Sequence, residues 1–476
     1  MKGKFKAIVD WFEDRNGLIA IMRAALTHPV PRSSRWPYVL GSATLTCFLI
    51  QVVTGIALST SYVSGTGQAY DSLKFITNGS VLGHFLRGLH YFGASGMVLL
   101  VGLHTIRVYL TGSFKFPREM NWLTGAALLL FTLLMGFTGQ LLRWDQTGVW
   151  SAVIAAEQAG RAPLGHFVAR FILAGDTVGG ATLSRYYAFH VFFIPAMIFV
   201  ILGWHLYLVL HNGISEWPQA GRLVDPKTYR QWYQDLLKKD GVPFWPDAAW
   251  RDVVFGTAVV FTLAALAVFI GPPELGRPPD PTVIQAYPRP DWYLLWYFGL
   301  LALLPAGAEN YVIVYGPIAF GILLVAVPFL SNRGERSPSR RPWAVGIVLF
   351  ATLMIGVFWA KAVKARWSPD FGAEPLSASV VASSNPQVIR GAQLFHARGC
   401  QYCHEIAGDG GKRGPELTDV GSRLTEGQMI WRILNGGVNM PAFGQSLAPA
   451  DLNAIVAFLK SRVQPTRQSG APSRRQ

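Results

Sequence analysis

The chain has 476 residues, of which 51% are apolar and only 14% are charged, and its mean hydropathy is +0.29. Soluble globular proteins carry about 25% charged residues, so this composition excludes a disordered chain and argues against an ordinary soluble enzyme. The net charge is +15. In a membrane protein such an excess marks loops on the cytoplasmic side, and we expect no nucleic-acid partner.

Uncharged apolar stretches long enough to cross a bilayer as helices, which takes about 20 residues, recur along the chain. They lie at 38–60, 88–106, 120–142, 186–211, 253–273, 310–332 and 342–360. A further stretch, 292–308, is shorter and contains Pro305, so we expect it to lie at the membrane interface. The predicted fold class is therefore all-α, an integral membrane bundle of seven spans followed by a small extracytoplasmic helical domain.

Basic residues decide the orientation of this bundle. With seven spans, the loops on the N-terminal side hold most of the Lys and Arg residues that precede the last span. The N-terminus is therefore predicted to be cytoplasmic and the C-terminal domain extracytoplasmic, in a bacterial cytoplasmic membrane. Between Phe5 and Met22, apolar residues recur near helical spacing among basic ones. This pattern predicts an amphipathic helix on the cytoplasmic membrane surface, with a plain basic tail as the alternative.

Histidines inside the predicted spans are candidates for function, because imidazoles are costly in hydrocarbon. His90 and His104 lie on the second span, and His190 and His205 lie on the fourth with a separation one position longer. Both separations are close to four helical turns, which take about 14.4 residues, so each pair occupies one helix face. Since both spans run inward, His90 should meet His190 near the outer surface, and His104 should meet His205 near the inner one. Two axial ligands suit a haem, whereas zinc takes more ligands.

Glycines on the first and third spans repeat with the same spacing as the histidines of the second span. They are Gly41, Gly55, Gly125 and Gly139. Glycine lets the backbone approach a large planar group closely, so we expect these positions to line two haem slots. Arg87 and Arg107 flank the histidines of the second span, three positions outside each, and are predicted to neutralise haem propionates.

The sequence from about residue 30 to 365 resembles the cytochrome b of cytochrome bc complexes, especially the b6f variety. Its first part is similar to cytochrome b6 and its second part to subunit IV, fused in one chain. The segments that carry the resemblance are HTIRVYLTGSFKFPREMNWLTG (104–125), GQLLRWDQTGVWS (139–151) and TLSRYYAFH (182–190). The resemblance implies two non-covalent haems b on the four histidines and adds Arg185 as a propionate partner. Arg143 stands where the family usually has Pro before Trp.

The stretch after the fifth span begins with Pro290-Asp291-Trp292-Tyr293, which resembles the family's PEWY motif with Asp in place of Glu. Quinol oxidation needs a proton acceptor beside an apolar pocket, so the resemblance implies catalytic roles for Asp291 and Tyr293. An interfacial aromatic belt is the alternative. The Asp form is similar to members that use menaquinone.

Cys47 lies in TLTCFLIQ (44–51), which is similar to the cytochrome b6 stretch whose Cys carries an additional covalent haem beside the inner haem b. The resemblance therefore predicts a covalent haem at Cys47, while inert packing is the alternative for a lone Cys in a membrane helix.

A haem c attachment pattern lies near the C-terminus. Cys400-Gln401-Tyr402-Cys403-His404 supplies two thiols for thioethers and His404 as an axial ligand. Residues 385–462 resemble a small class I cytochrome c, and the stretch around Met440 resembles the loop that gives the sixth ligand. A thioether ligand raises the potential, which suits an acceptor. No thiols remain for an iron–sulfur centre.

These features predict a domain order, which runs 1–37 amphipathic N-terminus, 38–215 haem-binding domain, 216–362 subunit IV-like domain, 363–384 linker, 385–462 cytochrome c domain and 463–476 disordered tail. The predicted function is the cytochrome b and c subunit of a proton-translocating quinol:cytochrome c oxidoreductase. Its expected substrate is quinol, and it is expected to be embedded in membrane lipid. Its expected partners are a separate Rieske iron–sulfur protein, a downstream cytochrome or other electron acceptor, and a second copy in a homodimer. Two alternatives stay open, a di-haem cytochrome b anchor of a dehydrogenase and a non-enzymatic haem electron conduit.

Overall fold

The computed structural model describes residues 2–279, 290–304, 308–364, 373–412, 414–436, 440, 442–444 and 446–463. The chain divides into two compact units, one of residues 1–278 and 310–354 and the other of residues 279–309 and 355–476. Helices dominate the described part. Its strands form three short antiparallel pairs, β1 (Pro29–Pro31) with β3 (Gly241–Pro243), β2 (Leu223–Val224) with β4 (Gly334–Glu335), and β5 (Glu405–Ile406) with β6 (Asp409–Gly410).

Seven helices in the described residues are long and apolar enough to cross a membrane, as predicted. They are Trp36–Ser59, Val81–Leu110, Glu119–Leu141, Gly180–Asn212, Trp250–Phe269, Ala308–Leu330 and Pro342–Val363. The shorter apolar stretch forms α13 (Leu295–Leu303), a helix of nine residues. At 1.5 Å per residue it is about 13 Å long, less than half of the roughly 30 Å hydrocarbon layer. It therefore does not span the bilayer; Pro305 lies outside the described residues.

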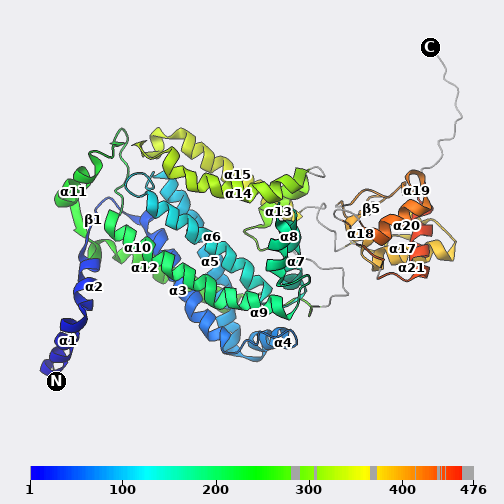
Figure 1. Ribbon diagram of the computed structural model, residues 1–476, viewed down its shortest axis with the longest axis horizontal. Coiled ribbons are helices and arrows are strands. Elements are labelled where there is room, and N and C mark those ends of the chain that lie inside the picture. The colour runs from blue at the N-terminus through cyan, green and yellow to red at the C-terminus, as the bar shows by residue number, and fades with distance from the viewer. Residues whose placement is uncertain are drawn as a thin grey trace, which may run out of the picture. The chain divides into compact units, whose positions relative to one another are not determined.

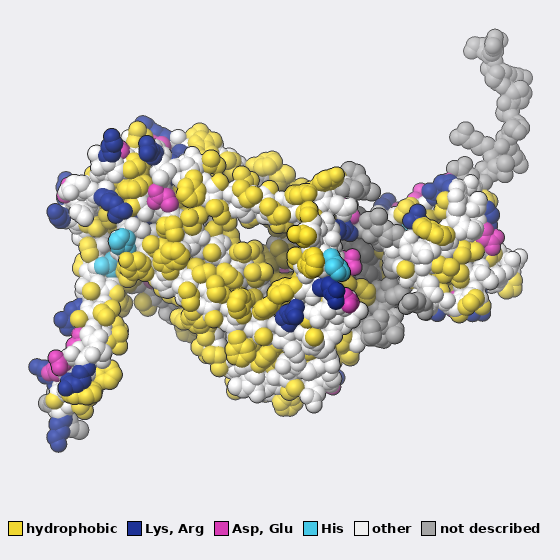
Figure 2. All heavy atoms as spheres, in the orientation of Figure 1, with side chains coloured by type: hydrophobic (Ala, Val, Ile, Leu, Met, Phe, Trp, Pro, Cys, Tyr) yellow, Lys and Arg dark blue, Asp and Glu magenta, His cyan; other side chains and the backbone are white. Residues whose placement is uncertain are grey.

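The flanks of these long helices are apolar and exposed. Phe261 is 70% exposed and Leu330 78% exposed, and Figure 2 shows hydrophobic side chains covering the helices on the face in view. Soluble proteins rarely expose contiguous apolar patches larger than a few hundred Å². The surface therefore fits lipid contact, as the span assignment requires.

Four helices form the centre of the first unit (Figure 1). They are α3 (Leu40–Ser59), α5 (Val81–Leu110), α6 (Glu119–Leu141) and α10 (Ile194–Asn212). Helix α3 packs on α5, α6 packs on α10, and α12 (Trp250–Phe269) packs on both α3 and α5. The start of α5 is set by Ser80, whose side chain accepts a hydrogen bond from the backbone N–H of Gly83 at 3.0 Å, a standard N-cap.

A π-turn interrupts the fourth span at its first histidine. Helix α9 (Gly180–Ala188) passes through η3 (Phe189–Phe193) into α10, and the N–H of Ile194 donates to the carbonyl of Phe189, five positions back. A π-turn accommodates one extra residue in a continuous helix. This explains how His190 and His205 share a helix face, although their separation is one position longer than that of the histidine pair on α5.

The N-terminal segment consists of two helices rather than the single predicted one. Helices α1 (Lys2–Asn16) and α2 (Leu18–Thr27) are separated by Gly17, whose φ is +63°. The Glu13 carboxylate accepts hydrogen bonds from the N–H groups of Ile19 and Ala20 at 2.7 and 2.8 Å, and so caps the start of α2. Apolar side chains of both helices are exposed, Phe5 at 71% and Ile21 at 65%. A position on the membrane surface stays a prediction.

A buried charge network ties together the loops at one end of the first unit. Arg336 forms an ion pair with Glu216, and both side chains are almost fully buried. The Tyr229 hydroxyl donates to Glu216 at 2.9 Å and accepts from Arg118 at 2.8 Å. Each buried charge therefore has a partner, which a charge removed from water requires. The network fixes α11 (Tyr229–Asp240) and the loop before α15 (Pro342–Lys364) to the end of α10.

The cytochrome c-like part has its own apolar core. Its helices are α17 (Pro386–Ala397), α18 (Cys400–Cys403), α19 (Val420–Arg423), α20 (Glu426–Asn435) and α21 (Pro449–Lys460). Helix α17 packs on α21, and their side chains Phe395 and Phe458 lie together at the centre with ring centroids 5.7 Å apart.

Residues 374–381, which the sequence places in a linker, pack against this core. Helix α16 (Ala378–Val381) buries Val381, and Arg462 donates to the carbonyl of Val381 at 2.8 Å. Gln401 donates to the carbonyl of Glu374 at 2.8 Å. Residues 374–381 are therefore part of the packed domain rather than a free connection. Residues 365–372 of the predicted linker and the predicted tail from residue 464 lie outside the described residues.

The remaining elements include the span α14 and shorter helices. They are η1 (Trp36–Val39), α4 (Ala69–Lys74), η2 (Phe75–Gly79), α7 (Gln146–Gly160), α8 (Gly165–Leu173), η4 (Phe244–Ala248), α14 (Ala308–Leu330) and η5 (Pro338–Arg340).

Candidate functional site

Each of the four predicted glycines lies against one of the four predicted histidines. A Cβ built on Gly41 would lie 3.2 Å from Cε1 of His104, and one on Gly55 would lie 3.3 Å from Cε1 of His90. A Cβ built on Gly125 would lie 3.5 Å from Cε1 of His205, and one on Gly139 would lie only 2.7 Å from Cε1 of His190. Because α3 and α5 run antiparallel, as do α6 and α10, the glycine at the start of one helix meets the histidine at the end of its neighbour.

The outer pair of histidines faces across the bundle. The ring centroids of His90 and His190 are 6.3 Å apart, with the rings at 70°. His104 and His205 lie further along the same two spans, and each faces its own glycine, Gly41 and Gly125. The structure therefore brings together the rings of the outer pair, while the pairing of His104 with His205 stays a proposal.

Three threonines that the sequence analysis did not single out orient three of these histidines. Oγ1 of Thr54 lies 2.8 Å from Nδ1 of His90. Thr138 is 3.0 Å from Nδ1 of His190, and Thr124 is 2.8 Å from that of His205. Each threonine directly precedes one of the paired glycines, so the recurring Thr-Gly dipeptide was the available signal.

The backbone decides which atom donates in these three contacts. Each threonine hydroxyl donates its single proton to a carbonyl one helical turn earlier, at 2.6 Å for Thr54, 2.9 Å for Thr124 and 2.9 Å for Thr138. The hydroxyl can therefore only accept from the imidazole, which places the histidine proton on Nδ1. The lone pair of Nε2 is left free to bind a metal, in the arrangement that is usual for metal-ligating histidines.

His104 is the exception among the four. Its glycine, Gly41, follows Leu40 rather than a threonine, and Nδ1 of His104 lies 3.4 Å from a guanidinium nitrogen of Arg107. A guanidinium cannot accept a hydrogen bond. Arg107 itself is held above the ring of Tyr38, with Cζ 4.6 Å from the ring centroid. Of the two inner histidines, one is therefore oriented by a hydroxyl and the other lies beside a half-buried guanidinium.

The outer histidine pair fits two axial ligands of one iron. A metal–imidazole nitrogen bond is about 2.0–2.1 Å long, and a ring nitrogen lies about 1.1 Å from the ring centre, so opposed imidazoles would have centroids about 6.2 Å apart. The 6.3 Å separation of His90 and His190 matches this value. In the described part of the chain, no group of three or more His, Cys, Asp or Glu side chains is placed to hold a bare metal ion. The donor set suits haem.

The three predicted propionate partners lie in different surroundings. Arg87 is buried and donates to Oγ1 of Thr77 at 3.0 Å. Arg107 lies beside His104. Arg185 donates to the carbonyl of Phe171 and stacks on its ring, with Cζ 5.1 Å from the centroid. Arg87 and Arg107 lie one turn from a histidine of the pair, as predicted, and their role towards propionates stays a proposal.

Cys47 lies in a closed apolar cluster between α3, α5 and α12. Its side chain is fully buried with Ala43, Leu100 and Leu263, and Sγ lies 3.4 Å from the position of a Cβ on Gly96. A haem bonded to this sulfur would need the space that Leu263 and its neighbours fill. The residues around Cys47 therefore do not fit the additional haem in this arrangement, and its attachment there stays a prediction for experiment.

The PDWY motif forms a compact turn before α13 in the second unit. The Tyr293 hydroxyl donates to Oδ2 of Asp291 at 3.1 Å, and the rings of Trp292 and Tyr293 are perpendicular with centroids 5.7 Å apart. The Trp359 indole N–H donates to the carbonyl of Trp292 at 3.1 Å and so ties the turn to α15. A carboxylate beside a phenol and an indole can accept a proton from a hydroxylated ring.

The CQYCH motif places two thiols on a short helix and an imidazole directly after it. Cys400 and Cys403 begin and end α18, and Cys400 packs against the domain core. Burial raises the pKa of the Cys400 thiol to about 12. Burial also lowers the pKa of His404, whose Nδ1 lies 2.7 Å from the carbonyl of Pro415. That carbonyl can only accept, so Nε2 of a neutral His404 is free for iron, and the arrangement fits haem c.

Met440, the predicted sixth ligand, packs against the same core as Cys400. Its neighbours Asn439 and Pro441 lie outside the described residues. The structure therefore places Met440 in the cytochrome c-like domain without testing its role as a ligand.

Comparisons with known proteins agree with this arrangement in both parts of the chain. Residues 26–213 match the family model described as cytochrome b/b6/petB. Residues 386–459 match the model described as cytochrome c oxidase, cbb3-type, subunit III. The first match covers the four histidines and their glycines, and the second covers CQYCH and Met440.

Similar curated proteins are cytochromes b6. The protein from Synechococcus elongatus (strain ATCC 33912 / PCC 7942 / FACHB-805) is 40% identical over 209 residues, which cover 44% of this chain and 97% of that protein. The protein from Mastigocladus laminosus is 39% identical over the same coverage. Among solved structures, a chain of "Hyperthermophilic respiratory Complex III" matches with a TM-score of 0.62 and 24% identity, covering 83% of this chain and 96% of that one. This structural likeness concerns the fold alone.

Proposed function

The chain belongs to the cytochrome b/b6 family, and we propose that it is the cytochrome b and c subunit of a quinol:electron-acceptor oxidoreductase that translocates protons. The observation that carries this proposal is the register of the histidine pairs. In this proposal His90 pairs with His190, whose ring lies beside it, and His104 pairs with His205 at a second depth of the same bundle. Two haems b held there would supply one-electron carriers near opposite faces of the membrane.

The polypeptide contributes orientation and a dry, close-packed slot to those carriers. Thr54, Thr124 and Thr138 hold three imidazoles with Nε2 free, and the glycines leave room beside the rings. Hydrogen bonds from ligand imidazoles to a fixed acceptor also raise the basicity of the ligand. The four-helix core would therefore fix both the geometry and the electronic properties of these three ligands.

Quinol oxidation is assigned to the PDWY motif. A quinol gives up two protons with its two electrons, so its site needs a proton acceptor next to a ring pocket. Asp291 is the acceptor in this proposal, and Tyr293, hydrogen-bonded to it at 3.1 Å, orients the carboxylate and shares the proton. The Asp form of the motif suggests menaquinol as the substrate.

The two electrons are assigned to different acceptors. One electron would cross the membrane through the two haems b at the histidine pairs, towards a quinone near the inner face. The other would leave through a separate Rieske iron–sulfur protein to the His404 domain, since the three cysteines of this chain leave no thiols for such a centre. A downstream cytochrome would then take the electron. We further propose that the complex is a homodimer in the cytoplasmic membrane of a bacterium, with the cytochrome c domain outside.

The purified complex tests this function directly. With a short-chain quinol as donor and a c-type cytochrome as acceptor, Asp291→Asn should lower turnover by about 100-fold, within the range that a positioned base contributes. The haem spectrum should stay unchanged. Asp235→Asn is the matched control, because Asp235 is an exposed carboxylate on α11. Normal turnover in Asp291→Asn, or a complex without a Rieske subunit, would contradict the proposal and favour a dehydrogenase anchor or an electron conduit.

A further inference from the structure

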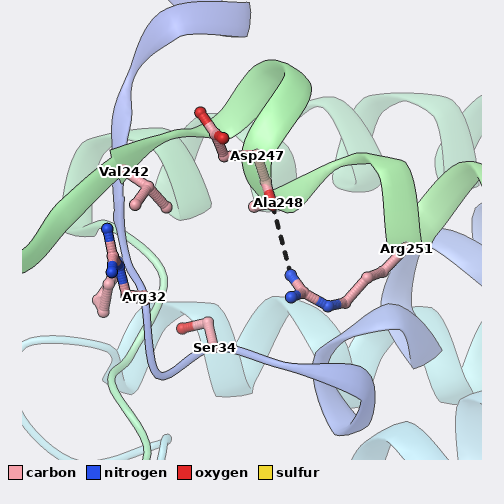
Figure 3. A pocket seen from close by; sticks show the side chains of 7 residues that line it. Arg32, Ser34, Val242, Asp247, Ala248 and Arg251 are labelled. Atoms are coloured by element: carbon pink, nitrogen blue, oxygen red, sulfur yellow. Dashed lines mark hydrogen bonds between the residues drawn. The ribbon is translucent and has the colours of Figure 1, made fainter.

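A polar pocket lies at the end of the bundle where α3 and α12 begin. Its volume is about 200 Å³, and it is lined by Pro31, Arg32, Ser34, Val242, Asp247, Ala248 and Arg251. Figure 3 shows Arg32 and Arg251 on opposite sides of the space, from the segment after β1 and from α12. The pocket therefore joins two parts of the chain that are distant in sequence, in a place separate from the histidine pairs and the PDWY turn.

The pocket lies at the level of the lipid headgroups. Arg251 is the second residue of the span Trp250–Phe269, and Arg32 and Ser34 directly precede the span Trp36–Ser59. Trp36 and Trp250 are 47% and 43% exposed, and their rings meet edge to face with centroids 5.5 Å apart. Exposed tryptophans at the ends of spans mark the membrane–water interface. A ligand of this pocket would therefore have its polar part among the headgroups.

Both arginines can bind an additional acceptor. The Arg251 guanidinium has a long contact of 3.4 Å with the carbonyl of Asp247, and it lies over the Trp250 ring at 4.7 Å. Arg32 pairs with Asp240 at 3.8 Å, with both side chains more than half exposed, an arrangement that contributes little in water. Guanidinium groups form strong, charge-assisted hydrogen bonds with phosphate oxygens.

The other polar groups of the wall accept hydrogen bonds. The Ser34 hydroxyl donates its proton to the carbonyl of Ser215 at 3.1 Å, so its oxygen can only accept from a ligand. The Asp247 carboxylate is likewise an acceptor. The two arginines and the Asp247 carboxylate give the wall a net charge of +1. Ser34 and Asp247 supply its two hydrogen-bond acceptors. It complements a ligand with one negative charge and hydroxyl donors.

We propose that this pocket binds the headgroup of an anionic glycerophospholipid of the phosphatidylglycerol type. Its phosphodiester lies between Arg32 and Arg251, and its headgroup hydroxyls donate to Ser34 and Asp247. Basic pockets beside spans on the cytoplasmic side are known to take anionic headgroups, and the N-terminal side of this chain is its basic side. The bound lipid would link the start of α3 to the start of α12.

Native mass spectrometry of the full, haem-loaded chain tests this site. After detergent exchange removes the native lipids, the protein is titrated separately with phosphatidylglycerol, phosphatidylcholine and inorganic phosphate. One phosphatidylglycerol should bind tightly, with phosphatidylcholine and inorganic phosphate at least about tenfold weaker, because only the first offers both an anchored anion and hydroxyl donors. Arg251→Gln should weaken this binding about tenfold, the effect expected for a lost charge-assisted hydrogen bond.

Arg32→Gln is the second variant, because the exposed Arg32 side chain can be replaced without disturbing the bundle. It should weaken phosphatidylglycerol binding in the same way, and unchanged haem absorbance would show that both variants are folded. Lys227→Gln is the control, since it removes an exposed positive charge on the same side away from the pocket. The proposal would be overturned if phosphatidylcholine or inorganic phosphate bound as tightly as phosphatidylglycerol. It would also be overturned if both arginine variants bound phosphatidylglycerol as tightly as the parent protein does.

Discussion

The hydroxyl of Thr138 lies 3.0 Å from Nδ1 of His190 while donating its own proton to the carbonyl of Leu134 at 2.9 Å. The imidazole must therefore donate from Nδ1, and its Nε2 is directed to the ligand side. The adjacent Gly139 leaves the space into which the His190 ring fits. One Thr-Gly dipeptide on α6 thus determines the proton position and the depth of the histidine in η3.

Replacing Thr138 with Val should raise the reduction potential of the outer haem b. Without the acceptor at Nδ1 the imidazole is a weaker donor, which favours the reduced iron. A redox titration of haem b absorbance in the purified complex measures the shift. Thr138→Ser should restore the parent value.

The control for this prediction is Thr132→Val. Thr132 is also buried on α6 and donates to the carbonyl of Leu128 at 2.8 Å, and it lies six positions before Thr138, on a different face of the helix. An identical potential in Thr138→Val and the parent protein would show that the hydroxyl does not act through His190.

Gly139→Ala should displace His190 and lower the haem b content of the protein. The added methyl would lie 2.7 Å from Cε1 of the imidazole, closer than side chains tolerate, whereas at Gly125 the same distance is 3.5 Å. Alkaline pyridine spectra of the purified chain measure the haem content. Gly125→Ala should keep both haems b, and Gly102→Ala, where nothing lies within 4 Å, is the neutral control. Full haem content in Gly139→Ala would contradict the proposed close approach.

The common spacing of the glycines and histidines could be predicted because both sets follow one helical period, but the sequence placed the glycines beside the haems. Their contact with the histidines is visible only in the packing of the helices. The threonines could not be chosen in the same way, since a helical threonine commonly bonds to a carbonyl of its own helix. Only the neighbouring helix shows that Thr54, Thr124 and Thr138 also accept from histidines. The exception at His104, beside Arg107, depends on the same interhelical geometry.

Of the differences from the predicted fold, one has a local cause and one depends on contacts between distant residues. The break at Gly17 depends on the Glu13 carboxylate, which stabilises a new helix start that the apolar spacing does not reveal. Residues 374–381 have the Ser- and Ala-rich composition of a linker. They are fixed by Val381 in the core and by hydrogen bonds from Gln401 and Arg462, which are contacts between distant residues.

Cys47→Ser tests the additional haem that the sequence resemblance predicts. If Cys47 carries haem through a thioether, a denatured fragment ending before residue 380 should stain for haem in the parent protein and lose the stain in the variant. The His404 domain should stain in both, which makes it the internal control. A parent fragment that never stains would establish Cys47 as a packing residue, in keeping with its closed cluster of Ala43, Leu100 and Leu263.

The acid stability of the cytochrome c-like domain should depend on Asp451. Hydrogen bonds from Arg390 and Arg398, at 2.7 and 3.2 Å, lower its pKa. The stabilisation is therefore complete above the ordinary aspartate pKa of about 3.9, and it is lost as the pH falls through the lower native value.

Asp451→Asn should accordingly flatten the fall in stability between about pH 5 and pH 2. Thermal unfolding of the domain, followed through haem c absorbance in the full chain, measures this effect. Asp409→Asn, which changes an exposed carboxylate in the turn at β6, should keep the parent slope. If the thermal stability of Asp451→Asn fell with pH as steeply as that of the parent protein, the two arginines would not link α17 and α21 through this carboxylate.

Rapid mixing of the oxidised complex with quinol, in the absence of a downstream acceptor, tests the central claim most directly. If the two electrons of each quinol separate, haem b and haem c should become reduced in equal amounts in the first turnover. Asp291→Asn should slow both reductions together, while Asp235→Asn should slow neither. Reduction of haem c with haem b remaining oxidised, or of haem b alone with the Rieske protein present, would contradict the account.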